Sequence, residues 1–89
     1  MQAMDKLCWG VIGIGVDNRH ESALQVQEIL TDFGDVILGR MGLPMRSADI
    51  CIISLVIDGK SAKAHQLTER LSALPGVHVT HALSDCRPK

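Results

Sequence analysis

Aromatic side chains and runs of one charge are scarce in this chain of 89 residues. It holds one Trp, one Phe and no Tyr, so it lacks the rings on which the bases of a single-stranded nucleic acid stack. Nine Lys and Arg against ten Asp and Glu give a formal charge of −1, without the concentrated positive surface that phosphate binding needs. We therefore expect no direct binding to nucleic acid.

Apolar runs long enough for a membrane span and clustered cysteines are also missing. No stretch reaches the roughly 18 apolar residues of a span, and the N-terminus lacks the charged-then-apolar order of a signal peptide. We expect a cytoplasmic protein without membrane association. Cys8, Cys51 and Cys86 lie far apart and form no CxxC motif, so neither a disulfide framework nor a zinc ribbon is indicated. Pairing of Cys8 with Cys86 stays open, and Cys51 is expected to be a small buried side chain.

The residues that are present alternate with the periods of strands and helices. Strands are predicted over 9–16, 36–42, 50–57 and 77–83, and the 43–49 segment, which contains Pro44, is predicted to be a turn. Apolar stripes spaced three and four residues apart predict helices between Glu21 and Gly34 and between Ser61 and Pro75. Asn18 with Glu21 is predicted to cap the first helix.

This order, β-α-β-β-α-β, predicts one domain over 1–89 with its core between residues 8 and 83. Right-handed crossovers give an α+β, ferredoxin-like split βαβ fold. The antiparallel sheet is expected in the order 4-1-3-2, with both helices on one face.

The strand over 50–57, ICIISLVI, is apolar on both of its faces. Two helices cover only one face of the sheet, whereas an antiparallel sheet with a wet face normally alternates with polar residues. Each exposed large aliphatic side chain forgoes about 1.5–3 kcal/mol of burial. We expect a homo-oligomer, a dimer or tetramer, that associates through the open sheet face; the alternative is a loop or tail of the chain folded across it.

One group of polar residues is a candidate ligand site. Asp17, Asn18, Arg19 and His20 lie at the start of the first expected helix, where free backbone N–H groups bind anions. The alternative is an ordinary capped helix start. Arg40 interrupts an otherwise apolar strand; it could pair with an anion or carboxylate across a subunit interface, or be an edge-strand charge that discourages aggregation.

Catalysis, a metal site and a dinucleotide site are not indicated. No serine or cysteine has an evident base partner, and no two carboxylates are placed for acid/base chemistry. His78 and His81 project to opposite faces of one strand and so cannot chelate one metal within a subunit. Gly13 and Gly15 lie within a strand and lack a third glycine opening the helix, so they are expected to be structural. We predict no catalytic or metal-binding residues, and the sequence identifies no cofactor.

The segments GVIGIGVDNRHESALQVQEIL, DVILGRMGLP, DICIISLVIDG and LTERLSALPGVHV resemble the small iron-only hydrogenase system regulators, which are ACT-like. They are also similar to the C-terminal, metal-responsive domain of nickel-dependent repressors. The most specific piece is RMGLP, from Arg40 to Pro44. Leu43 and Met45 stand where the nickel-repressor pattern has histidines, which argues against nickel sensing.

The resemblance implies a non-enzymatic, effector-responsive, oligomeric regulatory domain linked to hydrogenase maturation or expression. An effect on transcription would need a separate DNA-binding partner. Three hypotheses remain: a sensor that binds a small-molecule effector at subunit interfaces near Asp17–His20 and Arg40; a protein–protein docking module without a ligand; and a small ferredoxin-like enzyme that uses the cleft beside His20.

Overall fold

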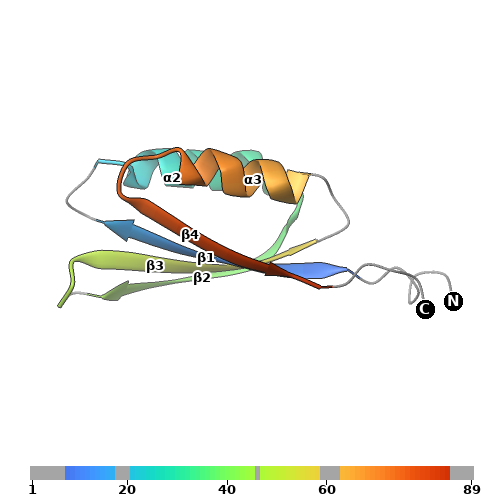
Figure 1. Ribbon diagram of the computed structural model, residues 1–89, viewed down its shortest axis with the longest axis horizontal. Helices are drawn as coiled ribbons and strands as arrows, with labels where there is room; N and C mark the ends of the chain where they lie inside the picture. Colours follow the sequence, from blue (N-terminus) through green and yellow to red (C-terminus); the bar gives the residue numbers. More distant parts are fainter. Residues whose placement is uncertain (1–7, 18–20, 46, 59–62, 85–89) are drawn as a thin grey trace, which may run out of the picture.

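The computed structural model describes residues 8–17, 21–45, 47–58 and 63–84. They form two layers, with helices α2 and α3 side by side over one face of a four-stranded sheet (Figure 1). The elements, in chain order, are β1 (Trp9–Asp17), α2 (Ala23–Asp32), β2 (Ile37–Met45), β3 (Ile50–Asp58), α3 (Lys63–Ser72) and β4 (Val77–Leu83).

The sheet has the order β2-β3-β1-β4, and every neighbouring pair of strands is antiparallel. This is the predicted order 4-1-3-2 read from the other edge, so the ferredoxin-like arrangement is confirmed. The two central strands, β1 and β3, are paired along both of their backbone edges, and they carry the longest apolar runs.

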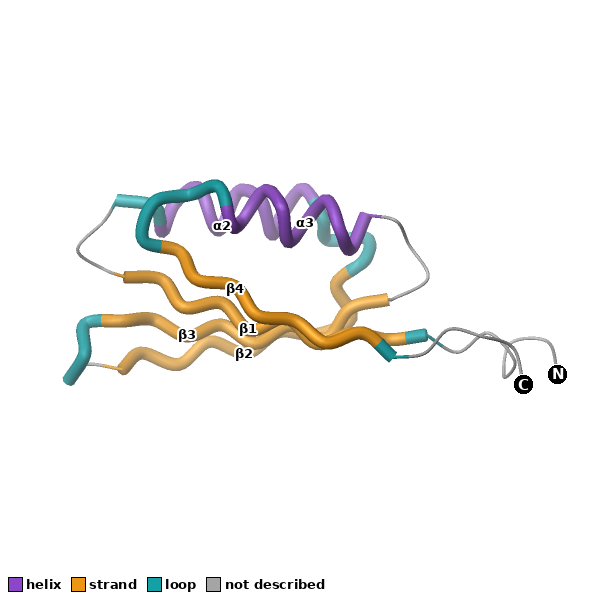
Figure 2. Tube along the Cα trace, viewed as in Figure 1, coloured by secondary structure: helices purple, strands orange, loops and turns teal. Residues whose placement is uncertain are grey.

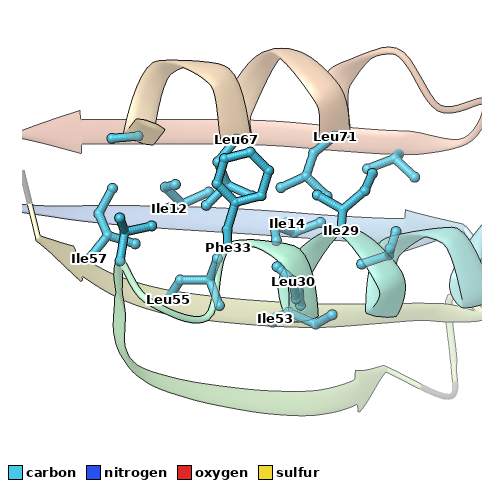
Figure 3. Packing of buried hydrophobic residues seen from close by; sticks show 14 of the residues in the cluster. Ile12, Ile14, Ile29, Leu30, Phe33, Ile53, Leu55, Ile57, Leu67 and Leu71 are labelled. Carbon is cyan, nitrogen blue, oxygen red and sulfur yellow. The ribbon is translucent and has the colours of Figure 1, made fainter. Parts of the chain in front are cut away.

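The core lies between the sheet and the two helices (Figure 3). On β1, Ile12, Ile14 and Val16 face the helices and are at most 2% exposed, which is the predicted alternation. The apolar stripes of α2 and α3 pack against these side chains in the same core cluster. The largest fully buried side chains are Ile12, Ile14, Leu30, Leu55, Ile57, Leu67, Leu71 and Val26.

The connection from α3 to β4 follows the predicted Pro-Gly signal. Gly76 has φ 72°, a left-handed conformation that glycine adopts without a Cβ clash. The hairpin between β2 and β3 contains Asp49 with φ 55°, a region that Asp tolerates better than most residues.

Strand β2 is longer than predicted, and the expected turn over 43–49 is wrong at its first three residues. β2 continues through Pro44, which pairs in register with Cys51, to Met45. Proline is tolerated there because β2 is an edge strand. It has no neighbouring strand on its outer side, so the missing N–H of Pro44 removes no hydrogen bond there.

The start of α2 also differs from the prediction. The helix begins at Ala23 with Ser22 as N-cap, so the Asn18–Glu21 pair does not occupy the cap positions. The Ser22 hydroxyl does not cap the helix; it donates to the backbone oxygen of Pro75 at 2.7 Å and so ties the start of α2 to the end of the α3–β4 connection.

Of the cysteines, Cys8 is buried. Cys51 has a free thiol and is half-buried against the core. Cys86 and Ser61 lie outside the described residues.

Candidate functional site: the uncovered face of the sheet

The face of the sheet opposite the helices carries most of the exposed large apolar side chains. β3 shows the contrast within one strand, since Ile53 is 4% exposed and Ile52 is 39% exposed. Both helices lie on the Ile53 side, and no described segment lies against the other side (Figure 2). We call this other side the open face.

The strand register identifies the remaining members of the open face, because directly paired residues in a sheet project to the same side. On β2, Met41 pairs with Ser54, Leu43 with Ile52, and Met45 with Ile50. These are the residues of β2 that alternate outward. The large apolar side chains of the open face that are at least 39% exposed are Trp9, Met41, Leu43, Met45, Ile52 and Val56.

The open face is divided into a raised half and a hollowed half. The β2–β3 half holds five of the six large exposed side chains, and the sixth, Trp9, lies at the start of β1. In the middle of the β1–β4 half, Gly13 pairs with Thr80 and Gly15 with His78, so both β1 positions there lack a side chain. A shallow hollow of about 320 Å³ lies there, and it is lined by Gly13, Ile14, Gly15, Ile52, His78, Val79 and Thr80.

The glycines of β1 have different reasons for lacking a side chain. A Cβ on Gly10 would collide with the Leu83 side chain and lie 3.2 Å from Ile57 Cγ1, so this position needs glycine for close packing. A Cβ on Gly13 would lie 3.1 Å from Thr80 Cγ2. A Cβ on Gly15 would meet no atom closer than 4.0 Å. Gly15 is therefore not required by packing within the protomer, and it leaves an empty position on the open face.

The middle of the open face carries no charge. Three cross-strand rows run through it, and they contain no Lys, Arg, Asp or Glu. The rows are Gly39–Val56–Val11–Ala82, Met41–Ser54–Gly13–Thr80 and Leu43–Ile52–Gly15–His78. A charge-free, apolar patch of this kind is typical of an interface core rather than of a wet sheet face.

The predicted ligand residues lie apart from one another where the structure describes them. Asp17 ends β1; it is 8% exposed, and its N–H donates to the backbone oxygen of Gly76 at 2.8 Å. Asn18, Arg19 and His20 lie outside the described residues.

Arg40 is on the helix side of the sheet. It pairs with the buried Leu55, and its Nη2 donates to Gln27 Oε1 on α2 at 2.7 Å. Asp17 pairs with Ile50, five residues away along β3, which corresponds to about 17 Å. Asp17 and Arg40 therefore do not belong to one site within a protomer. Arg40 lies on an edge strand, and both interpretations of its charge stay predictions.

The sequence interpretation missed Leu43 and Met45 as members of the open face because it ended the strand at Gly42, and it did not assign Met41, which lies within the predicted strand, to a face. The signal was present: these three residues alternate with period 2 and match the outward residues of β3. His78 and His81 do project to opposite sides, since His78 pairs with Gly15 and His81 with Ile12.

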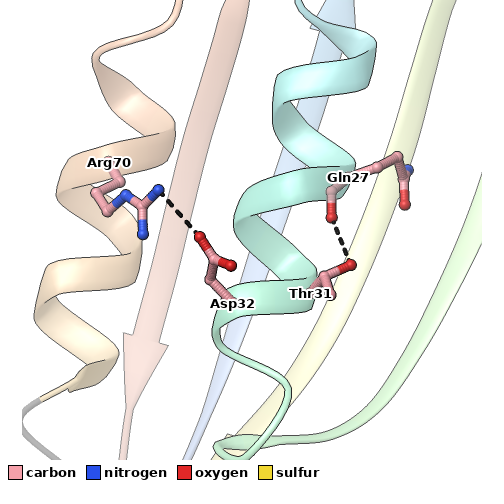
Figure 4. Close-up of polar contacts among 4 residues, drawn as sticks. All are labelled: Gln27, Thr31, Asp32 and Arg70. Carbon is pink, nitrogen blue, oxygen red and sulfur yellow. Dashed lines mark hydrogen bonds and ion pairs between the residues drawn. The ribbon is translucent and has the colours of Figure 1, made fainter.

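The helix layer presents a mixed, polar surface. A hollow of about 730 Å³ between α2 and α3 is bordered by Asp32 and Arg70, which form an ion pair of 3.4 Å. Figure 4 shows this pair across the helices, beside Thr31, whose hydroxyl donates to the Gln27 backbone oxygen on the same helix. The Arg70 guanidinium also lies 5.4 Å from the centre of the Phe33 ring. The cation among the residues that line this hollow, Arg70, is engaged with Asp32 and Phe33, and the remaining charged residue of the lining, Glu28, is acidic.

One carboxyl group at the edge of the helix layer has a shifted pKa. Lys63 Nζ donates to Asp35 Oδ2 at 2.7 Å, and this hydrogen bond lowers the pKa of Asp35 below its ordinary value. In the described part of the chain, no three His, Cys, Asp or Glu residues gather to hold a metal ion. None of the described helices is long and apolar enough to cross a membrane.

Fold and site together define a class: a small ferredoxin-like α+β domain in which the described helices cover one face of the sheet. Within this class, residues 9–81 match the sequence model of the family described as "TM1266-like: Iron-only hydrogenase system regulator, putative". The match extends from the first residue of β1 into β4. The chain belongs to this family.

Among solved structures, the chain is similar to the uncharacterized protein TM1266 from Thermotoga maritima, with 30% identity and a TM-score of 0.81 over 86% of this chain and 96% of that one. An unknown protein from Galdieria sulphuraria shares 9% identity with a TM-score of 0.60, over 86% of this chain and 45% of that one. A formyltetrahydrofolate deformylase from Pseudomonas putida KT2440 shares 14% identity with a TM-score of 0.52, over 84% of this chain and 28% of that one. The last two likenesses show the fold alone. Comparison with curated proteins gives no match.

Proposed function

We propose that this chain is a non-catalytic regulator of an iron-only hydrogenase system that works as a homo-oligomer, associating through its open face. The observation that carries the proposal is the uncharged, apolar middle of that face. Membership of a regulator family supports the regulatory half, and the exposed side chains support the oligomeric half.

The energetics favour association. The six large side chains of the open face keep between 39% and 61% of their surface exposed. Full burial of such a side chain contributes about 1.5–3 kcal/mol, so the exposed remainder represents roughly 1 kcal/mol for each one. Two copies together would gain on the order of 10 kcal/mol, which is comparable with the cost of about 4–15 kcal/mol for joining two molecules. Micromolar association needs a net gain of about 8 kcal/mol beyond that cost, so the smaller side chains of the three rows must contribute to the interface as well.

A regulator must also respond to a signal. We place the effector next to the end of β1, at Asp17, Asn18, Arg19 and His20. Arg40 lies about 17 Å from Asp17 along the strands and on the helix side of the sheet. An association through the open face therefore does not bring Arg40 to this site, and it would contribute only through a further subunit contact, as in a tetramer. Effector binding would then shift the assembly state.

Size-exclusion chromatography with light scattering tests the oligomeric half of the proposal. At micromolar concentration we expect a mass of at least two chains; a clean monomer would overturn the proposal. A thermal-shift screen with amino acids, nucleotides and divalent metals distinguishes an effector-binding regulator from the alternative, a docking module without a ligand. We expect one of them to raise the melting temperature, and stabilisation by none would favour docking.

A matched pair of histidine variants tests where an effector binds. His20→Ala should abolish the shift, whereas His65→Ala should leave it unchanged, because the His65 side chain is 78% exposed on α3 and its partner is Glu69 of the same helix. An unchanged shift in His20→Ala would remove the turn after β1 as the effector site.

A further inference from the structure

The geometry points to a specific partner and pose for the open face: a second copy, related by a two-fold axis that runs between the sheets along the strands, with Ile52 of each copy seated over Gly15 of the other. This inference rests on the proposed self-association and goes beyond it, because it states which residues meet. It is carried by the division of the open face into a raised half and a hollowed half.

The order of the strands decides which halves meet (Figure 2). A two-fold axis along the strands places β2 of one copy over β4 of the other and β3 over β1. A two-fold axis across the strands instead places β3 over β3 and β1 over β1. Only the first arrangement puts the raised half of each copy against the hollowed half of its partner. Packed sheets commonly keep their strands within about 30° of parallel, and this arrangement satisfies that preference.

The register then determines the facing residues. In the row Leu43–Ile52–Gly15–His78, the axis passes between Ile52 and Gly15. The same row of the second copy faces it in reverse, so each Ile52 lies over a Gly15. Ile52 protrudes with 39% of its surface exposed, and the hollow of about 320 Å³ beside it is open at Gly15.

The neighbouring rows follow the same rule. In the row Met41–Ser54–Gly13–Thr80, the exposed Met41 lies over Thr80 of the second copy, and Ser54 lies over Gly13. Ile52 and Met41 thus lie over the smaller Gly15 and Thr80. Two pairs differ from this rule, because Val56 lies over Val11 and Leu43 over His78. None of the three rows contains Lys, Arg, Asp or Glu, so no such charge is buried.

The size of the face suits a second copy. Four strands about 4.8 Å apart and seven residues at about 3.4 Å each cover roughly 450 Å² per copy in projection, and side-chain relief adds to this. The area buried on two copies is thus near the ~1,000 Å² at which a specific interface becomes stable. Shape complementarity is needed at this size, and the raised and hollowed halves supply it.

The test exchanges the protruding and the hollow residue. Gly15→Leu fills the hollow without a clash in the protomer, since a Cβ there meets nothing closer than 4.0 Å. It should weaken association about 100-fold or more, because overpacking acts at both symmetric contacts. The double variant Gly15→Leu with Ile52→Ala restores one large and one small residue at each contact. It should recover association to within about tenfold of the wild type.

Matched controls separate the pose from general effects. Gly42→Leu makes the same change on the helix side of the sheet, where a Cβ also meets nothing closer than 4.0 Å, and it should leave the dissociation constant unchanged. Sedimentation velocity gives the dissociation constant, and circular dichroism reports whether each variant is folded. If Gly15→Leu does not fold, Ile52→Ala alone provides the test: it should weaken association at least about tenfold, while Leu24→Ala on α2 should not.

The outcomes separate this inference from the proposed function. If wild-type protein associates but folded Gly15→Leu associates equally or more tightly, the pose is wrong and the oligomeric regulator stands. If the exchange variant stays as weak as Gly15→Leu, the Ile52–Gly15 contact is likewise wrong. If the wild type is a monomer, the oligomeric proposal itself fails.

Discussion

Replacing Ile53 and Ile52 one at a time by alanine distinguishes the two roles of β3, packing of the core and association through the open face. The residues are sequence neighbours with the same side chain, and they lie on opposite faces, with 4% and 39% of their surface exposed. Ile53 packs into the core between the sheet and the helices. Removing it leaves a cavity and should cost about 2–5 kcal/mol of unfolding free energy.

For a domain of this size each kcal/mol corresponds to about 4–8 °C, so Ile53→Ala should lower the melting temperature by more than about 10 °C. Ile52→Ala leaves no cavity in the protomer because its side chain borders solvent, and we expect a cost of about 1 kcal/mol or less there. Its effect should appear in association instead.

Thermal unfolding at two protein concentrations resolves the two effects, because a dimer melts at a higher temperature as its concentration rises. Ile53→Ala should lower the melting temperature at both concentrations and keep its concentration dependence. Ile52→Ala should lose most of the concentration dependence. Equal destabilisation by both changes at the lower concentration would refute the assignment of the two faces.

Three further changes test individual contacts. Gly10→Ala should destabilise the protein by about 1–3 kcal/mol through overpacking. Gly39→Ala, with no atom within 4 Å of the new Cβ, should be neutral. Urea unfolding measures both changes, and equal effects would contradict the packing described for β1. Ser22→Ala removes the hydroxyl that donates to the Pro75 backbone carbonyl in the α3–β4 connection, and it should lower the free energy of unfolding by about 1–2 kcal/mol. Urea unfolding measures this loss as well, and an unchanged free energy of unfolding would contradict that contact. Lys63→Ala should raise the pKa of Asp35 in an NMR titration. Because the pKa of Asp35 is lowered in the folded state, its carboxylate stabilises the protein above the ordinary pKa, and this stabilisation is lost as the pH falls through the folded-state pKa. Lys63→Ala should abolish this pH dependence of stability.

The fold was predictable from the sequence because its signals agree with one another. Alternation in β1 and β3, the three-and-four spacing in α2 and α3, and the Pro75-Gly76 stop each specify one element. Six elements in this order leave few topologies once crossovers are right-handed.

The errors arose where tertiary context overrides a local rule. Pro44 normally ends a strand, but at the sheet edge it remains in register with Cys51. Ser22 rather than Asn18 precedes the first helical residue, and its hydroxyl serves a contact with a residue 53 positions away, which no local pattern reports.

The open face was predictable in part. The apolar outward residues of β3 and the glycines of β1 were visible as a pattern, but their mutual placement depends on the register between strands. Only the structure shows that Ile52 stands directly beside Gly15, so that a raised half adjoins a hollowed one. The proposed cluster of Asp17 with Arg40 was not testable by pattern, because sequence distance does not say which side of an edge strand a side chain occupies.

The most direct test of the central claim is sedimentation velocity of the wild-type chain over a dilution series from about 100 µM to about 1 µM, beside a variant in which Ile52 and Val56 are both replaced by serine. We predict an assembly of at least two chains at the upper end that dissociates on dilution, and a folded monomer throughout for the serine variant. A wild-type monomer at every concentration, or a serine variant that assembles as well as the wild type, would contradict it.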